Sequence, residues 1–204
     1  MCGRFAITLP NDAMAQLFAA RPANDLPDVP NRNVRPTDQI HTVISDATDR
    51  RLAPMRWGFV PVWYKALNDG PLLINARAET IAEKPAFSEA CRARRCLIPI
   101  SGFYEWTTGA DGKKQPWYIA AQDDAPLALA GIWQDWTRGE ASVRSCAIVT
   151  TAANEALKHI HHRMPVIVDA ADWPLWLGEA GKGAATLMRP ATDGLLKFEA
   201  RAPE

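Results

Sequence analysis

The residues best suited to chemistry stand at the start of the chain, in Met1-Cys2-Gly3-Arg4-Phe5. Cys2 becomes the N-terminal residue once Met1 is trimmed, which its small neighbours favour. An α-amine and a thiol, with ordinary pKa values of about 7.7–8.0 and 8.5, then stand on adjacent carbons and are both partly nucleophilic near neutral pH. Such a 1,2-aminothiol condenses with an aldehyde to an imine, and the thiol can then close a thiazolidine ring. By position alone, Cys2 also fits a small apolar residue that begins a strand.

Three further stretches carry polar groups among apolar runs: Asn75-Ala76-Arg77, Gly102-Phe103-Tyr104-Glu105-Trp106 and His161-His162-Arg163-Met164-Pro165. Glu105 stands between two aromatic residues, so we expect desolvation to raise its pKa, which would suit a general acid. Taken singly, each residue also has an ordinary structural interpretation. Glu105 fits a salt-bridge partner, Asn75 a turn or cap residue, and His161 a partner for a helix C-terminus.

The elements that must position these groups are mostly strands. We predict strands at residues 4–9, 40–45, 51–55, 72–74, 96–100, 117–120, 127–133, 145–151 and 166–168. We predict helices that begin at residues 10–12 and at Asp172, and helices over residues 85–95 and 154–160, the latter capped by Asn154. Four prolines in residues 21–36 predict a long loop, and residues 46–49 a polar turn.

Because strands outnumber helices and do not alternate with them regularly, the pattern predicts an α+β fold. We expect a single domain over residues 1–204, built on a twisted, largely antiparallel, barrel-like sheet with peripheral helices. A doubly wound parallel sheet is disfavoured.

Composition narrows the class of protein. A chain of 204 residues with 48% hydrophobic and 23% charged residues is globular, and it has no apolar run near the roughly 20 residues of a membrane span. No export signal is visible, so we expect a cytoplasmic protein with free thiols and no membrane partner. Cys91, Cys96 and Cys146 fit core positions. Since the four histidines are not at zinc-ligand spacing with the cysteines, we expect no metal and no cofactor.

Taken together and in this order, the four stretches resemble the SOS-response-associated peptidase (SRAP) family, proteins that process abasic sites and cross-link themselves to DNA. The resemblance runs from Met1 to about Val168. It implies that Cys2 attacks the ring-opened sugar aldehyde of an abasic site in single-stranded DNA, and that the adduct matures to a thiazolidine. It further implies that Asn75 holds the Cys2 end or the sugar and that Glu105 is the acid-base group.

The same resemblance assigns a role to one of two adjacent histidines. The family pattern H-x-R places the histidine two residues before Arg163, which selects His161 and leaves His162 variable. By this carry-over, His161 helps to open the sugar ring and to handle the 3′ phosphate region.

The resemblance also implies a DNA-binding surface. Arg4 and Arg77 match phosphate-binding arginines, Asn33 and Pro36 fit an R-x-N-x-x-P loop, and Trp63 with Tyr64 matches an aromatic pair that wedges against the bases. Tyr64 stands where relatives more often have Trp. The remaining DNA contacts implied in the same way are Thr150 and Arg163.

Two other classes of protein remain open from the sequence. An N-terminal nucleophile with a neighbouring base also describes a self-processing cysteine peptidase or amidase, although only Met1 precedes Cys2. A single-stranded DNA-binding module without chemistry would use Arg4, Arg77 and Trp63. We expect a monomer that binds single-stranded DNA containing abasic sites, protects the lesion during the DNA damage response, and is associated with the nucleoid while bound.

Overall fold

The computed structural model describes residues 2–46 and 49–204. Its strands are β1 (Phe5–Ile7), β2 (Ala20–Pro22), β3 (Asn31–Val34), β4 (Gln39–Ser45), β5 (Arg50–Trp57), β6 (Asn75–Arg77), β7 (Arg95–Ile100), β8 (Gly102–Thr108), β9 (Lys114–Ala121), β10 (Leu127–Arg138), β11 (Ala141–Ala152), β12 (Arg163–Pro165) and β13 (Leu196–Glu199). The α-helices of the described residues are α1 (Asn11–Leu17), α2 (Ser88–Ala93) and α3 (Trp173–Leu177). Two 3₁₀ turns, η1 (Ala170–Asp172) and η2 (Ala184–Leu187), flank α3. The α+β, largely antiparallel architecture predicted from the sequence is confirmed.

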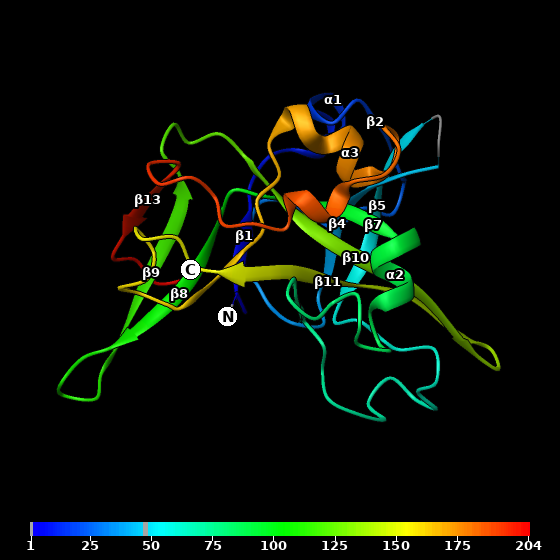
Figure 1. The fold of residues 1–204 in the computed structure, drawn as a ribbon, viewed down its shortest axis with the longest axis horizontal. Helices are drawn as coiled ribbons and strands as arrows, with labels where there is room; N and C mark the ends of the chain where they lie inside the picture. The colour runs from blue at the N-terminus through cyan, green and yellow to red at the C-terminus, as the bar shows by residue number, and fades with distance from the viewer. Residues whose placement is uncertain (1, 47–48) are drawn as a thin grey trace.

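Five strands close into a barrel. Strands β11, β10, β7, β4 and β5 pair antiparallel in that order, and the barrel closes where β5 pairs parallel with β11. The two longest strands, β10 and β11, form a hairpin whose two-residue turn places Gly139 at φ +56°, a conformation that glycine adopts without strain. Val43, Leu52, Ile98 and Leu129 are fully buried in the core of the barrel. Figure 1 shows these strands crossing at the centre of the molecule.

A second sheet, in the order β13-β9-β8-β1-β3, carries the start of the chain. β1 lies between β8 and β3, with Phe5 opposite both Phe103 and Val34. The buried Phe5 ring packs on Trp57 of the barrel with ring centroids 4.6 Å apart. This packing joins the two sheets where the N-terminal residues enter the fold, so the first residues of the chain lie at the junction.

The barrel strands predicted from the sequence are present, but five predictions were wrong. Residues 21–36 are not a continuous loop, because β2 and β3 form at its two ends. Residues 72–74 do not form a buried strand: Leu72 is 48% exposed, Leu73 makes a single bridge to Phe59, and the strand is β6 instead. The helix predicted over residues 85–95 is only α2, since Arg95 already belongs to β7. The predicted turn at residues 46–49 includes Ala47 and Thr48, which lie outside the described residues.

The fourth wrong prediction is the helix over residues 154–160, which is a series of turns. Asn154 does cap it, since its Oδ1 accepts the Leu157 N–H at 3.0 Å. The Leu157 and Lys158 N–H groups both donate to the Asn154 carbonyl oxygen, and those of Ile160 and His161 both donate to Leu157, so separate turns form in place of a continuous helix. The fifth wrong prediction is the strand over residues 166–168, which follows directly after the short strand β12. There the Val166 N–H donates to the Val149 carbonyl oxygen of β11, and the Val166 carbonyl oxygen accepts from the Ala130 N–H of β10.

Within residues 2–46 and 49–204, no helix combines the length and apolar character needed to cross a membrane.

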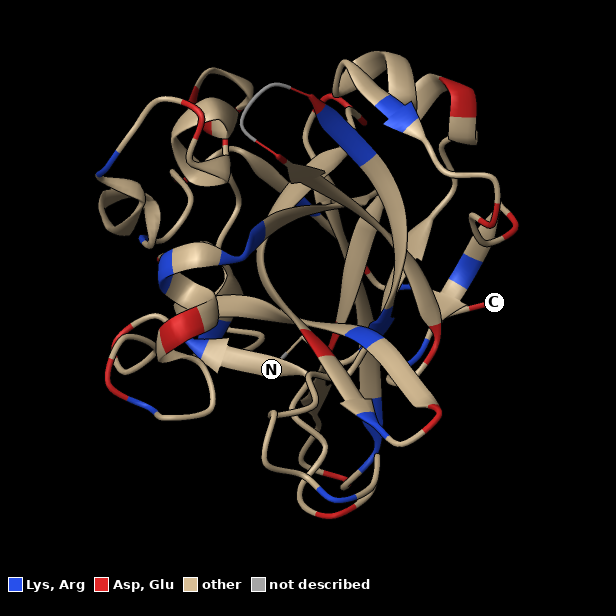
Figure 2. Ribbon diagram, turned by 90° about the vertical axis from the view of Figure 1, so that its right-hand side faces the viewer, with Lys and Arg blue, Asp and Glu red and all other residues tan. Residues whose placement is uncertain are grey.

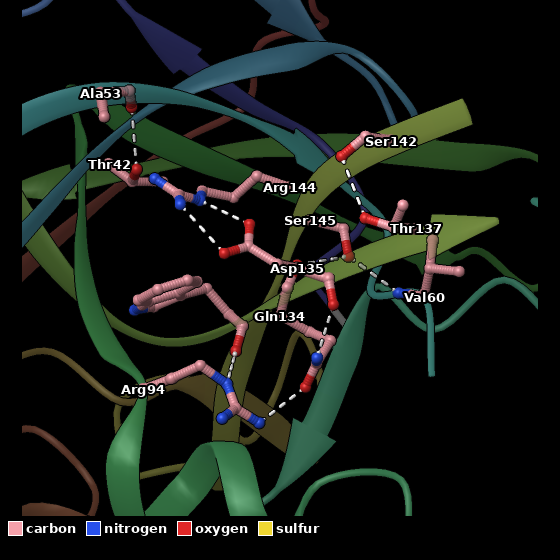
Figure 3. Close-up of polar contacts among 11 residues, drawn as sticks. Thr42, Ala53, Val60, Arg94, Gln134, Asp135, Thr137, Ser142, Arg144 and Ser145 are labelled. Carbon is pink, nitrogen blue, oxygen red and sulfur yellow. Dashed lines mark hydrogen bonds and ion pairs between the residues drawn. The ribbon is translucent and has the colours of Figure 1, made fainter. Parts of the chain in front are cut away.

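A buried serine marks the seam of the barrel. Ser145 on β11 is fully buried, and its hydroxyl accepts the Val60 N–H at 2.9 Å, just beyond β5 (Figure 3). We predict that Ser145→Ala lowers the free energy of unfolding by about 1–3 kcal/mol, because the buried N–H loses its acceptor. Urea unfolding would measure this change.

The control is Ser142→Ala on the same strand, whose exposed hydroxyl lies 3.3 Å from that of Thr137 (Figure 3). Its effect should stay within about 0.5 kcal/mol. Equal effects of the two variants would contradict a structural role for the Ser145 hydroxyl.

Candidate active site

Cys2 is held at the junction of the two sheets. Its side chain is 1% exposed, and the Asn75 side-chain amide donates to its carbonyl oxygen at 2.9 Å. Arg4, two residues on, accepts the Tyr104 backbone N–H at 2.9 Å. Asn75 begins β6, which pairs parallel with β11, so the position of this amide depends on the barrel. The predicted role of Asn75 in holding the Cys2 end agrees with this hydrogen bond.

The Cys2 thiol is less acidic than its position in the sequence predicts. Burial raises the pKa of this thiol far above its ordinary value, and the negative charge of Glu105 raises it further. The sequence predicts a partly ionised thiol near neutral pH once Met1 is removed, and the burial of Cys2 in the folded chain works against that ionisation. The sulfur stays protonated until a base removes its proton.

Glu105 supplies a carboxyl group beside Cys2. It lies on β8 opposite Trp117 and is 4% exposed. Desolvation raises its pKa, as predicted from its aromatic neighbours. Its charge acts on the Cys2 thiol, so the two groups are electrostatic neighbours. A carboxyl group that stays protonated above its ordinary range can give a proton to a leaving group and take one back.

His161 lies where β12 approaches the site. Its Nδ1 lies 2.9 Å from the Arg163 backbone nitrogen and 3.1 Å from the Arg163 carbonyl oxygen, so it accepts from the first or donates to the second according to the tautomer. Burial lowers the pKa of His161. The ring stacks on exposed His162 with centroids 4.5 Å apart. The Arg163 backbone therefore fixes the Nδ1 side of the ring, and burial favours the neutral imidazole.

Arg163, predicted to bind DNA, is largely enclosed by protein. Its side chain is 11% exposed and forms a bidentate ion pair with Glu79, with N–O distances of 2.7 and 2.9 Å. Its Nη2 also donates to the Thr150 carbonyl oxygen at 2.8 Å. Thr150 itself is fully buried. In this conformation neither side chain presents a free surface to DNA.

The predicted aromatic pair is split by the structure. Trp63 is 51% exposed in the segment between β5 and β6, whereas Tyr64 is only 8% exposed and packs with Val60 and Trp136. The Tyr64 hydroxyl donates to the Pro71 carbonyl oxygen at 3.3 Å. Of the two rings, only that of Trp63 offers a stacking surface.

The remaining predicted DNA contacts lie at the surface around the site. Arg77 is exposed on β6, two residues from Asn75 and thus on the same side of the strand. Arg4 donates to Asn33 Oδ1 at 2.6 Å, which ties it to the half-buried segment that also contains Pro36. Figure 2 shows Lys and Arg interspersed with Asp and Glu, so attraction of an anionic strand would depend on these local arginines.

Sequence reasoning missed Glu79 as a site residue. The signal was present, since residues 75, 77 and 79 continue one period-two pattern of polar side chains. Among the residues that the structure describes, no group of three or more His, Cys, Asp or Glu side chains is arranged to hold a metal ion.

Comparison with known proteins places this arrangement in context. A family model described as SOS response associated peptidase (SRAP) matches residues 1–200. The chain is 38% identical over 181 residues to the abasic site processing protein YoqW of Bacillus subtilis (strain 168), covering 87% of this chain and 80% of YoqW. It is 31% identical over 194 residues to the abasic site processing protein YedK of Escherichia coli (strain K12), covering 92% and 85%. A solved structure from Bacteroides thetaiotaomicron shares the fold, with a TM-score of 0.86 at 24% identity over 97% of this chain and 90% of that one.

The stacked histidines allow a titration test. The main cause of the lowered pKa of His162 is the charge of His161. We predict that His161→Ala moves the pKa of His162 upward, toward the ordinary imidazole value, because a like charge has been removed. NMR titration of the ring protons would measure this shift, with His159→Ala as the control, and an unchanged His162 pKa would contradict the coupling. In the unmodified protein, His161 should titrate below the ordinary value.

Proposed function

Because the chain belongs to the SOS response associated peptidase (SRAP) family, we propose that it cross-links covalently to abasic sites in single-stranded DNA through Cys2. The observation that carries the proposal is a buried cysteine beside a carboxyl group of raised pKa. The carbonyl oxygen of this cysteine accepts a hydrogen bond from the Asn75 side-chain amide. The relatives YoqW and YedK are named for abasic site processing. The reaction requires removal of Met1, which lies outside the described residues.

The first bond forms between nitrogen and carbon. The sugar of an abasic site opens to an aldehyde, and the His161 imidazole, held at Nδ1 by the Arg163 backbone, is suited to hydrogen-bond the oxygen that changes during opening. The free α-amine of Cys2 adds to the aldehyde carbon to give a carbinolamine. Glu105 then protonates the departing hydroxyl, water leaves, and an imine joins the protein to the sugar.

The second bond forms between sulfur and the same carbon. Glu105 has given its proton to the departing water and is now a carboxylate. This carboxylate is the base that the protonated Cys2 thiol requires. The imine is protonated, because its nitrogen kept one hydrogen when water left. Glu105 takes the thiol proton, and sulfur adds to the carbon of this protonated imine. The product is a thiazolidine, with Glu105 returned to its acid form and one water released overall. A single group of raised pKa serves both steps.

DNA recognition in this proposal rests on the exposed residues around Cys2. Trp63 offers a face on which a base beside the lesion can stack, and Arg77 and Arg4 supply phosphate contacts. These contacts suit a splayed single strand, in which bases are free to stack on an aromatic ring. Backbone contacts of this kind carry no sequence information, so the proposal includes no preference for flanking bases.

The role of Glu105 predicts a pH profile. The reactive state needs a neutral amine and a protonated Glu105, so the single-turnover rate should rise with pH, pass through a plateau and fall at the alkaline end. Glu105→Gln should react about 10²-fold more slowly and lose the alkaline fall, because only the amine then titrates. Quenched-flow cross-linking on denaturing gels would measure this, with the exposed Glu140→Gln as the control. An alkaline fall retained in Glu105→Gln would exclude Glu105 as the acid.

The free amine of Cys2 separates this proposal from its rivals. Mass spectrometry should find Met1 absent, and single-stranded DNA with an abasic site should give an adduct that survives denaturation, whereas undamaged DNA gives none. Cys2→Ala should abolish the stable adduct. A variant with extra residues ahead of Cys2 should bind DNA without cross-linking, because an amide nitrogen cannot form the imine.

Two outcomes of that experiment would favour other functions. Cross-linking by the extended variant at the rate of the trimmed protein would rule out the aminothiol mechanism. If the extended variant instead removed its own extension and then hydrolysed peptides, the protein would be an N-terminal-nucleophile peptidase.

A further inference from the structure

Glu79 forms a bidentate ion pair with Arg163 near the site, and none of the proposed reaction steps uses it. It lies two residues beyond the end of β6 and binds both terminal nitrogens of Arg163, at 2.7 and 2.9 Å. The side chain of Glu79 is 48% exposed, whereas that of Arg163 is 11% exposed. The guanidinium therefore faces the protein, and Glu79 closes it from the solvent side.

The pair bridges two strands that do not pair with each other. β11 pairs with β6 through Thr150 opposite Arg77, and with β12 through Thr150 opposite Pro165. Glu79 follows β6 and Arg163 begins β12, so the ion pair spans β11 at Thr150. The Thr150 carbonyl oxygen accepts from Arg163 Nη2 at 2.8 Å and its hydroxyl lies 3.3 Å from the same nitrogen. Arg163 is thereby held to both neighbouring elements.

The backbone of the same arginine orients His161. The backbone nitrogen and carbonyl oxygen of Arg163 lie 2.9 and 3.1 Å from His161 Nδ1, so the Arg163 backbone holds that side of the ring. A shift of Arg163 would move the groups on which the ring orientation depends. We propose that Glu79 is a positioning residue, which clamps Arg163 over Thr150 so that the Arg163 backbone holds the His161 ring in the orientation needed for the reaction. The catalytic part of this inference rests on the proposed function.

The charge balance favours this role over a phosphate contact for Arg163. The hydrogen bonds from Arg163 lower the pKa of Glu79, so the carboxylate is ionised at neutral pH and neutralises the guanidinium. Glu79 also occupies the edge of the guanidinium formed by its two terminal nitrogens, and the Nε atom of Arg163 is buried. Exposed Arg77, two residues before Glu79, has no such partner among the described residues and remains available to a phosphate.

Glu79→Gln tests the clamp with little change in shape. The glutamine side chain keeps one acceptor but turns an NH₂ group toward a guanidinium N–H, so the bidentate pair is lost. The matched control is Glu89→Gln. It breaks the ion pair, 2.7 Å long, between Glu89 in α2 and Arg94 directly after α2. Glu79→Asp, which keeps the charge with a shorter reach, should recover part of the lost function.

Two measurements on each variant test independently whether the Glu79–Arg163 pair positions His161. Nitrogen-15 NMR of the imidazole in the protein without DNA should show a changed His161 tautomer signal in Glu79→Gln and none in Glu89→Gln. Single-turnover cross-linking to abasic single-stranded DNA should slow about tenfold in Glu79→Gln, the lower end of what loss of an orienting partner produces. Affinity for undamaged single-stranded DNA should stay equal or rise, since a negative charge has been removed.

The outcomes are distinct. If affinity and cross-linking rate rise together in Glu79→Gln, Arg163 is a phosphate contact that Glu79 restrains, and the proposal is wrong. If the His161 signal and the rate match those of Glu89→Gln, the ion pair has no positioning role. If the unmodified protein does not cross-link at all, the proposed function fails, while the NMR comparison still decides whether Glu79 orients His161.

Discussion

The pairing of β11 with four other strands is the constraint on which the rest of the structure depends. Along one edge, β11 pairs first with β10 and then with β12; along the other, it pairs with β5 and then with β6. The β5 contact closes the barrel. The β6 contact places the Asn75 amide against the Cys2 carbonyl oxygen, and the β12 contact places Arg163 and its neighbour His161. One strand therefore sets the relative positions of three parts of the site that lie far apart in the sequence.

Burial then gives the site its chemical character. The pKa values of the Cys2 thiol and of Glu105 are raised and that of His161 is lowered, and desolvation is the leading cause for all three. Each shift favours the uncharged form of its group. In a desolvated site a proton can pass between groups of similar proton affinity. This suits a reaction that first protonates a hydroxyl and then deprotonates a thiol.

The charged residues divide into two kinds by the partners they have. Arg163 is enclosed and neutralised by Glu79, whereas Arg77 is exposed on the same side of the neighbouring strand as Asn75. The first arrangement stabilises local geometry and the second leaves a charge available to a ligand. The H-x-R pattern that draws attention to Arg163 in the sequence does not distinguish these roles, because the difference lies in the position of Glu79.

The sequence by itself determined the features that local composition controls. Apolar runs marked the barrel strands, such as Cys96–Ile100 within β7, and the aromatic neighbours of Glu105 predicted its raised pKa. The order of four short stretches predicted the family. These inferences succeeded because each depends on residues adjacent in the chain.

Only the tertiary structure decided the features that depend on distant partners. Residues 154–160 have the composition of a helix but form separate turns, whose N–H groups converge on the Asn154 and Leu157 carbonyl oxygens before the chain enters β12. Tyr64 and Thr150 are buried although the family pattern suggested contact with DNA, since Trp136 and Arg163 occupy the space around them. The pKa of Cys2 and the clamp formed by Glu79 were likewise beyond the sequence, because burial and ion pairing are set by strands that meet only in the folded barrel.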